Sequence, residues 1–228
     1  MQNDLFRQLS GLVLENKPAA LATRLSDGLQ CLMSADGVSG PLPLDAEGRA
    51  GMRKLLAERR CAHLGPDGGI FVRIYARPYR LIIIGAVHIA RYLAPMARMA
   101  NFEVIVIEPR QAFARMFDIP GVRLVAGWPD DVLPQMGVDE STAIATLTHD
   151  PKIDDAALAM ILSGPAFYIG SLGSRRTHEK RVRRMAELGL EGFVDRIASP
   201  IGLDLGGREP AEIAVSILAQ IIQQRYAA

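Results

Sequence analysis

Short apolar runs recur along the second part of the chain and predict five strands. They lie at residues 81–85, 103–108, 122–126, 142–147 and 166–170. None of these runs alternates strictly with polar residues, as expected where helices cover both faces of a parallel sheet. The connections between them are long enough to carry helices. Residues 80–228 are therefore predicted to form an α/β domain, a doubly wound parallel (Rossmann-like) sheet.

The first part of the chain follows a different pattern. Strand-like pieces at 20–25, 30–35 and 70–76 surround a helical stretch near 47–60, and the turns between them are rich in Gly, Pro and Asp. This pattern predicts a smaller N-terminal α+β domain over residues 1–76. We expect it to form part of the wall of a cleft at the carboxyl edge of the parallel sheet, and we expect the chain to form a dimer that completes this cleft.

Composition and charge narrow the classes of function. The 228 residues are 49% hydrophobic, and 26 basic against 25 acidic residues give a formal charge of +1, so nucleic acid and anionic membranes are not expected partners. No apolar run is long and clean enough to span a bilayer, and the N-terminus does not resemble a secretory signal, so a cytoplasmic location is expected. The two cysteines, Cys31 and Cys61, form no CxxC pair and are expected to pack.

The run LIIIGAVHIA (81–90) predicts a strand, a tight turn and a helix. In the dinucleotide fingerprint GxGxxG, the first glycine permits the turn and the second lets a pyrophosphate approach the backbone. Gly85 occupies the first place, but Val87 occupies the second and puts two methyl groups where the pyrophosphate would rest. The helix N-terminus still favours an anion. We expect Gly85, Ala86 and His88 to contact such a ligand.

Two further strand ends carry polar residues toward the same edge of the sheet, where open α/β folds bind ligands. Glu108 ends the second predicted strand, about where a ribose-binding carboxylate belongs, and the alternative is a solvated carboxylate. His149 and Asp150 follow the fourth predicted strand. For these two residues, the alternative is a His–Asp pair that caps the next helix.

A second glycine loop, YIGSLGSRRTHEKR (168–181), follows the fifth predicted strand and has the composition of a phosphate site. Over residues 171–189 six Arg or Lys stand against two Glu, and Arg181, Arg183 and Arg184 are expected to be solvated. The Gly- and Pro-rich segment 198–210 could fold over the cleft. The loop residues expected to bind the ligand are Gly170, Ser171, Gly173, Ser174, Arg175 and Arg176.

Three ordered motifs carry a specific resemblance. THDPKIDDAAL, YIGSLGSRRT with the following ELG, and SPIGLDLGGREPAEIAVSILAQII together resemble the C-terminal Rossmann domain of the XdhC/CoxI family, accessory factors of xanthine dehydrogenase and related molybdenum hydroxylases. The resemblance covers roughly residues 80–225. Family members usually read GxGH where this chain reads GAVH. The family's N-terminal pieces GSxPR and GGxxE have no counterpart in residues 1–76.

The resemblance implies a protein that binds the molybdenum cofactor (molybdopterin), assists its sulfuration and delivers it to an apo molybdenum hydroxylase. A cysteine desulfurase would then be a further partner. The residues themselves show no nucleophile elbow, no zinc-ligand spacing and no acid pair placed by a motif, which fits a carrier or chaperone better than a hydrolase. The alternative is an NAD(P)-dependent oxidoreductase that uses Glu108 for the ribose, against which Val87 argues.

Overall fold

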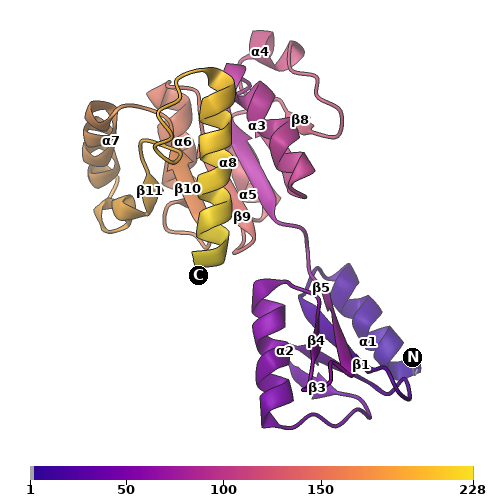
Figure 1. Cartoon of the computed structure of the whole chain (residues 1–228). Coiled ribbons are helices and arrows are strands. Elements are labelled where there is room, and N and C mark those ends of the chain that lie inside the picture. The colour runs from indigo at the N-terminus through magenta and orange to yellow at the C-terminus, as the bar shows by residue number, and fades with distance from the viewer. Residues whose placement is uncertain (1–2, 228) are drawn as a thin grey trace. The chain divides into compact units, whose positions relative to one another are not determined.

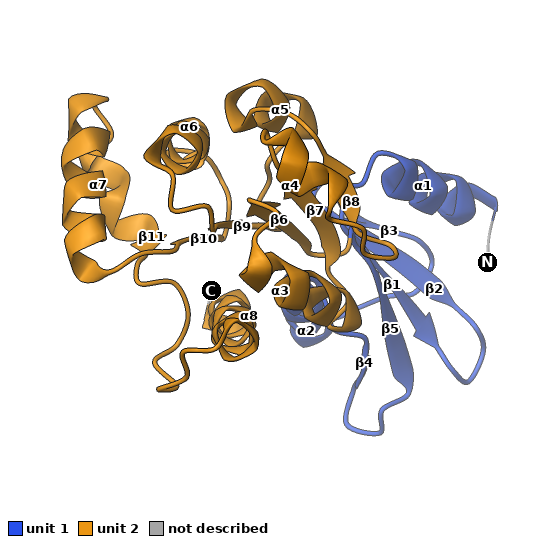
Figure 2. Cartoon of the chain, turned by 90° about the horizontal axis from the view of Figure 1, so that it is seen from above, with its two compact units in different colours: residues 1–77 blue, residues 78–228 orange. Residues whose placement is uncertain are grey.

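The computed structural model describes residues 3–227 and divides the chain into two compact units, residues 1–77 and 78–228 (Figure 2). Within the described residues no helix is sufficiently long and apolar to cross a membrane. The Rossmann-like parallel sheet and the smaller N-terminal α+β fold, both predicted from the sequence, are present.

The N-terminal unit is a five-stranded antiparallel sheet with a helix on each face, and the strand order is β3-β2-β1-β5-β4 (Figure 1). The pieces predicted near 20–25, 30–35 and 70–76 form its three central strands. The first helix and the two edge strands were not predicted. Its elements are α1 (Asn3–Leu14), β1 (Ala19–Arg24), β2 (Gln30–Ser34), β3 (Gly37–Ser39), α2 (Ala46–Glu58), β4 (Ala62–Leu64) and β5 (Ile70–Tyr75).

Alternation along β1 places the core of this unit on both faces of the sheet. Ala20 and Ala22 pack with the apolar side chains of α2, whereas Ala19 and Leu21 pack with those of α1. Successive side chains of a strand point to opposite faces, so a strand covered on both sides is apolar throughout. Cys31 is buried in the α2 layer, as predicted, but Cys61 is exposed, so the packing prediction was wrong for Cys61.

The C-terminal unit is built on a six-stranded parallel sheet in the order β11-β10-β9-β6-β7-β8. All five predicted strands are present, within two residues of the expected bounds, and the two-residue β11 was not predicted. Its strands are β6 (Arg80–Ile84), β7 (Glu103–Ile107), β8 (Arg123–Val125), β9 (Thr142–Thr146), β10 (Tyr168–Ser171) and β11 (Ile197–Ala198).

Helices cover both faces of this sheet, which makes it doubly wound. Leu81 and Ile83 of β6 pack with α3 and α8, whereas Ile82 and Ile84 pack with helices of the other face, including α6. Figure 2 shows α3 and α8 on one side of the sheet and α5 and α6 on the other. The helices are α3 (His88–Met99), α4 (Gln111–Arg115), α5 (Pro129–Met136), α6 (Pro151–Ile161), α7 (Arg175–Glu187), the 3-10 helix η1 (Glu191–Arg196) and α8 (Pro210–Ala227).

Candidate ligand site at the carboxyl edge

The strand order creates a switch point between β6 and β9. Counted from β6, the chain builds β7 and β8 on one side of β6 and then β9, β10 and β11 on the other, which is the order 3-2-1-4-5-6 of dinucleotide-binding sheets. Ligands of such sheets bind at the carboxyl ends of the strands beside the switch point. The loops that follow β6, β9 and β10 leave from three neighbouring strands and meet at this edge.

The turn after β6 is a tight glycine turn pressed against the loop after β9. Gly85 has φ +108°, and a Cβ added there would lie 2.5 Å from Cγ2 of Thr148. Only glycine meets both constraints without strain. The chain then enters α3 with Val87 at the N-cap, where no side chain caps the helix, and with His88 exposed. The first backbone N–H groups of α3 therefore lack a capping side chain, as an anion site requires.

Val87 lies at the border between core and surface. It is half-buried, packs against the apolar layer of α3, and also lines a hollow of about 260 Å³ beside the turn. His88 and Arg91 of α3 also line this hollow, as do Phe113 and Met116. This hollow therefore combines an apolar wall with two basic side chains.

Glu108 is completely buried, so the prediction of an open ribose-binding or solvated carboxylate is wrong. Its Oε2 accepts hydrogen bonds from the backbone N–H of Ala86 at 2.8 Å and from Arg110 Nη2 at 2.8 Å. Oε1 accepts from the backbone N–H of Arg110 at 2.9 Å and from its Nε at 2.7 Å. A carboxylate offers about four acceptor positions, and here four are used. Glu108 therefore holds the glycine turn and has no capacity left for ribose hydroxyls.

Burial and hydrogen bonding act in opposite directions on the pKa of Glu108. Burial alone would raise it, but the hydrogen bonds from Arg110 and from the backbone N–H of Ala86 outweigh burial, and the pKa lies below its ordinary value. Arg110 also stacks on Phe113, with the guanidinium carbon 4.2 Å from the ring centroid. Arg110 was not singled out in the sequence, although its position two residues after a strand-end carboxylate was a usable signal.

The glycine loop after β10 divides into a buried and an exposed part. Gly170 lies inside β10, and a Cβ there would lie 2.6 Å from two side-chain atoms of Ile201, so this glycine serves packing within the strand. Ser171 is completely buried, and its hydroxyl contacts that of Thr146. Neither residue faces an incoming ligand as the sequence predicted. The turn itself is made by Gly173, with φ +141°.

Exposed basic residues begin the helix after this turn. Ser174 caps α7 by accepting a hydrogen bond from the backbone N–H of Thr177 at 3.2 Å. Arg175 and Arg176 follow in the first turn, both exposed, and no acidic residue shares that turn. Cations at a helix N-terminus oppose the helix dipole unless an anion joins them. These two arginines are therefore placed where a bound anion would be stabilising.

The remaining basic residues of α7 do not share one environment. Arg183 is exposed as predicted, but Arg181 is only 2% exposed and Arg184 is ion-paired with Asp155, so the prediction that these two arginines are solvated is wrong. Arg181 Nη2 donates to the carbonyl of Leu172 at 3.0 Å, and Nη1 lies 3.4 Å from the Ser199 hydroxyl. Arg181 thus joins the loop after β10 to the segment after β11.

A second buried carboxyl group lies next to the loop after β9, at the start of α6. Asp150 is the N-cap of α6 and accepts from the backbone N–H of Lys152 at 3.0 Å, and His149 is exposed with φ +61°. The capping alternative therefore holds for Asp150 but not for the imidazole of His149. Asp154 was not singled out in the sequence, although it is only 1% exposed and accepts hydrogen bonds from both Thr148 and His149.

The segment after β11 is attached to α8. The backbone N–H of Gly202 donates to Gln220 Oε1 at 2.8 Å, and the backbone N–H of Leu203 donates to the carbonyl of Ser216 at 3.1 Å. A Cβ on Gly202 would lie 2.4 Å from the Ser216 hydroxyl, so glycine permits the close approach. These contacts fix the beginning of the segment that the sequence suggested as a cover for the cleft.

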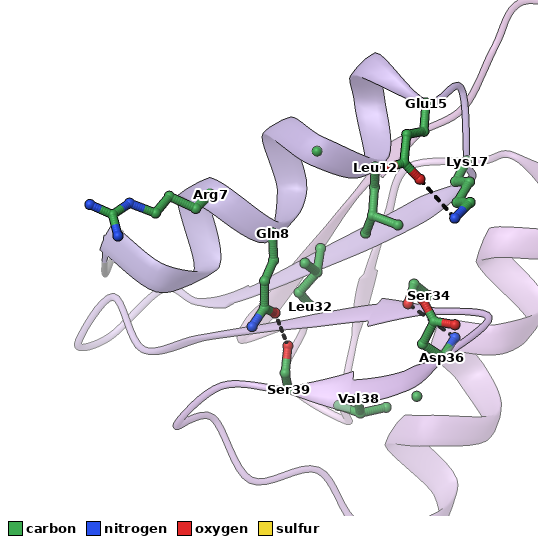
Figure 3. Close-up of a pocket in the computed structure, with 12 residues that line it drawn as sticks. Arg7, Gln8, Leu12, Glu15, Lys17, Leu32, Ser34, Asp36, Val38 and Ser39 are labelled. Atoms are coloured by element: carbon green, nitrogen blue, oxygen red, sulfur yellow. Dashed lines mark hydrogen bonds and ion pairs between the residues drawn. The ribbon is translucent and has the colours of Figure 1, made fainter.

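A separate hollow of about 480 Å³ lies in the N-terminal unit between α1 and the β2–β3 hairpin (Figure 3). Its polar side chains largely satisfy one another: Ser39 donates to Gln8 at 2.6 Å, and Lys17 pairs with Glu15 at 2.7 Å. Arg7 extends away from the other labelled side chains in Figure 3. Throughout residues 3–227, no three His, Cys, Asp or Glu side chains are grouped so as to hold a metal ion. This hollow therefore leaves few of its polar groups open to a ligand.

The parallel strand order, the glycine turn after β6 and the helix that follows it define a Rossmann-type domain. The chain belongs to the XdhC family: residues 81–221 match the family model described as the XdhC Rossmann domain. The three motifs at 148–158, 168–177 and 199–222 all overlap this match.

Curated relatives and solved structures are similar to the chain. A protein from Bacillus subtilis described as a probable xanthine dehydrogenase subunit is 32% identical over 165 residues, which cover 72% of this chain and 48% of that protein. The molybdenum cofactor insertion chaperone PaoD from Escherichia coli is 33% identical over 89 residues, 39% of this chain and 28% of that protein. The chain thus spans less than half the length of each of these relatives.

The similar structure is a crystal structure described as a xanthine dehydrogenase from Bacillus halodurans. It matches with a TM-score of 0.73 and 21% identity, over 97% of this chain and 63% of that one. At this identity the match establishes a shared fold, and it includes both units of the present chain.

Proposed function

We propose that this chain is an accessory protein in the maturation of a molybdenum hydroxylase of the xanthine dehydrogenase type, and that it binds the molybdenum cofactor at the carboxyl edge of its parallel sheet. Membership of the XdhC family supports this proposal. So do the names of the two relatives, one a molybdenum cofactor insertion chaperone and the other a probable xanthine dehydrogenase subunit.

The observation that carries the proposal is the uncapped N-terminus of α3 at the switch point. Val87 supplies no capping side chain, the first turn holds no acidic residue, and His88 is exposed there. Molybdopterin carries a phosphate, and backbone N–H groups at a helix N-terminus are suited to bind one. The donor set of this edge therefore fits an anionic cofactor.

Two more loops supply donors along the same edge. His149 follows β9, and Arg175 and Arg176 follow β10. Strands of a sheet lie about 4.8 Å apart, so the turns after β6 and β10 are separated by roughly 10 Å, with the β9 turn between them. A ligand that meets both ends must be extended, as a pterin with a phosphate or a nucleotide is. We infer that the three turns bind different parts of one ligand.

When bound, the cofactor supplies the molybdenum centre on which the target hydroxylase depends. The residues of this chain bind and orient it: the N-terminus of α3 receives an anionic group, and the two arginines donate charge-assisted hydrogen bonds to another. We further propose that sulfuration, with a cysteine desulfurase as the sulfur source, and insertion into the apo-hydroxylase follow from this complex. In this proposal a homodimer performs these steps in the cytoplasm.

An NAD(P)-dependent oxidoreductase is the second candidate, because the strand order is that of dinucleotide-binding sheets. Two features of the turn argue against it. All four acceptor positions of Glu108 are used within the protein, and Val87 stands where the pyrophosphate would approach the backbone. A nicotinamide cofactor would therefore bind without its usual ribose contact.

Equilibrium binding separates the two candidates. Purified protein is titrated with molybdenum cofactor, NADH and NADPH, and the loaded protein is then mixed with an apo-hydroxylase whose recovered activity is measured. We expect retention of the molybdenum cofactor and recovery of activity. Tight NADPH binding with hydride transfer to a carbonyl, without cofactor retention, would replace the proposal by its rival. Light scattering at micromolar concentration tests the dimer, and a monomer there rejects it.

A further inference from the structure

The backbone of His149 is unusual for its place in the fold. Four non-glycine residues among residues 3–227 have a positive φ: Asn16, Arg59, Asn101 and His149. The first three end or follow helices α1, α2 and α3, where a left-handed residue is a common terminator. His149 instead follows strand β9. The left-handed region is unfavourable for a residue with a Cβ, so other contacts must stabilise this backbone conformation of His149.

The group that holds this backbone is the carboxylate of Asp154. Its Oδ1 accepts from the Thr148 hydroxyl at 2.7 Å and lies 3.3 Å from the backbone nitrogen of Thr148. Its Oδ2 accepts from the backbone N–H of His149 at 3.1 Å. The Thr148 hydroxyl in turn accepts from the backbone N–H of Asp150 at 3.1 Å. One side chain from the first turns of α6 thus binds both residues of the turn before that helix.

Burying this carboxylate is costly. Asp154 is 1% exposed, and its burial raises its pKa even though the hydrogen bonds from Thr148 and His149 and the charge of Arg181 oppose the shift. Arg181, also buried, belongs to the same charged layer and binds the loops after β10 and β11 through Leu172 and Ser199. Apolar residues of similar volume often stabilise a fold as well as a buried charge pair does. A role beyond stability would account for these two residues.

The turn that Asp154 holds lies at the centre of the edge. β9 stands between β6 and β10, and Thr148 abuts Gly85 of the neighbouring turn. The His149 side chain is exposed, and its imidazole makes no hydrogen bond to any residue between 3 and 227. It is therefore free to bind a ligand that spans the two glycine turns.

We propose that Asp154 is the positioning residue of the ligand site: by holding Thr148 and His149 in the left-handed turn, it presents the imidazole of His149 to an anionic group of the ligand between the two glycine turns. This inference rests on the proposed function for the identity of the ligand. The hydrogen bonds by which Asp154 holds Thr148 and His149 do not depend on which ligand binds.

The test compares Asp154→Asn with Asp155→Asn in the full chain. Asn has a single acceptor oxygen, so it loses the bonds of one Asp154 oxygen, whereas Asp155 pairs with Arg184 and Arg181 and makes no bond to the turn. Two quantities are measured: the dissociation constant for molybdenum cofactor, and the backbone conformation at residue 149 from NMR chemical shifts and couplings. We expect Asp154→Asn to lose the left-handed signal at residue 149 and to weaken binding about tenfold. Asp155→Asn should keep both.

A glycine variant separates presentation of the side chain from the turn itself. His149→Gly keeps the left-handed turn at lower cost and removes the imidazole, so it should raise the thermal midpoint and weaken binding about tenfold. Asn101→Gly, at the other non-glycine residue of this unit with a positive φ, should raise the thermal midpoint without changing binding. Adding Asp154→Asn to His149→Gly should not weaken binding further, because the imidazole that Asp154 positions is already absent.

Three results decide the inference. If residue 149 stays left-handed in Asp154→Asn, Asp154 is not the positioning residue. If His149→Gly binds as the wild type does, the imidazole does not contact the ligand. If wild-type protein does not bind molybdenum cofactor at all, the proposed function fails, and the NMR comparison of the two Asp variants still decides whether Asp154 holds the turn. Where Asp154→Asn does not fold, Thr148→Val removes the same hydroxyl bond and keeps the shape of the side chain.

Discussion

The carboxylate of Glu108, at the end of β7, accepts a hydrogen bond from the backbone N–H of Ala86, in the turn after β6, at 2.8 Å. The two residues are 22 positions apart in the chain and follow adjacent strands. This contact ties the glycine turn to its neighbouring strand. It also removes from solvent the carboxylate that a dinucleotide-binding protein would use for ribose.

We predict that Glu108→Gln destabilises the protein in a pH-dependent way. The pKa of Glu108 is lowered in the folded protein, so its contribution to stability is present above the unfolded pKa of about 4.3 and is lost as pH falls through the folded pKa. At pH 7 the free energy of unfolding should fall by about 1–3 kcal/mol, because Gln lacks the charge and one acceptor oxygen. The difference between the two proteins should shrink below about pH 4.

Denaturant unfolding at several pH values measures this difference. Glu103→Gln is the matched control, because Glu103 is exposed at the start of β7, the strand that Glu108 follows, and a surface change should remain within about 0.5 kcal/mol. If the unfolding free energies of wild type and Glu108→Gln differ by the same amount from pH 7 to pH 3, the pKa of Glu108 is not lowered in the folded protein.

The exposed arginines of α7 should matter for binding and not for folding. Replacing both Arg175 and Arg176 by Ala should weaken binding of molybdenum cofactor by more than tenfold, because each loses a charge-assisted hydrogen bond. Replacement of both arginines by Lys should restore only part of the lost affinity, since the ammonium group keeps the charge but lacks the planar guanidinium geometry. The thermal midpoint should stay constant or rise slightly, because cations oppose the dipole at a helix N-terminus.

Lys180 and Arg183 provide the control for this experiment, because both are exposed on the same helix beyond its first turn. Their double Ala variant should bind as the wild type does. Equal dissociation constants for wild type and the Arg175/Arg176 variants would reject a phosphate site in this loop.

Val87→Gly should raise affinity for a nucleotide or dinucleotide form of the ligand. The change removes two methyl groups from the turn and lets the backbone approach a pyrophosphate. Because Val87 is half-buried against the apolar layer of α3, the same change should cost about 1–2 kcal/mol of unfolding free energy. Titration with NADPH and with molybdenum cofactor measures the affinities. The affinity of Val87→Ala should lie between those of wild type and Val87→Gly. Unchanged affinity in both variants would mean that Val87 serves packing alone.

Gly85→Ala should destabilise the protein more than a glycine substitution in open space. The backbone at Gly85 has φ +108°, and the new Cβ would overlap Cγ2 of Thr148. A conformational cost of about 1–2 kcal/mol is expected for Gly137→Ala, where φ is +59° and nothing lies within 4 Å, and the cost at Gly85 should be at least as large. The overlap should add about 1–3 kcal/mol at Gly85 alone.

Adding Thr148→Ser to Gly85→Ala should restore part of the lost stability. It removes the methyl group that the new Cβ would meet and keeps the hydroxyl that donates to Asp154. The double variant should therefore recover most of the overlap cost in thermal unfolding. No recovery would show that the backbone conformation at Gly85, and not its contact with Thr148, requires glycine.

The local sequence carried enough information for most of the fold and for the outline of the site. Apolar runs without alternation indicated a parallel sheet, and glycine turns before helices indicated the edge of the sheet at which the candidate site lies. Arg181 shows what a local pattern leaves open. Arg181 and the exposed Arg183 stand in the same basic stretch of sequence. Arg181 lies four residues before buried Met185, and this spacing places it on the inner face of α7.

The sequence by itself determined the two folds, the glycine turns and the family motifs, because periodicity and turn chemistry depend on neighbours along the chain. Only the tertiary structure decided what Glu108, Asp154 and Arg181 do. Whether a carboxylate is open or used depends on donors that the fold brings from other strands, such as the N–H of Ala86. The left-handed turn at His149 likewise depends on the buried carboxylate of Asp154, whose burial requires the packed sheet and helices around it.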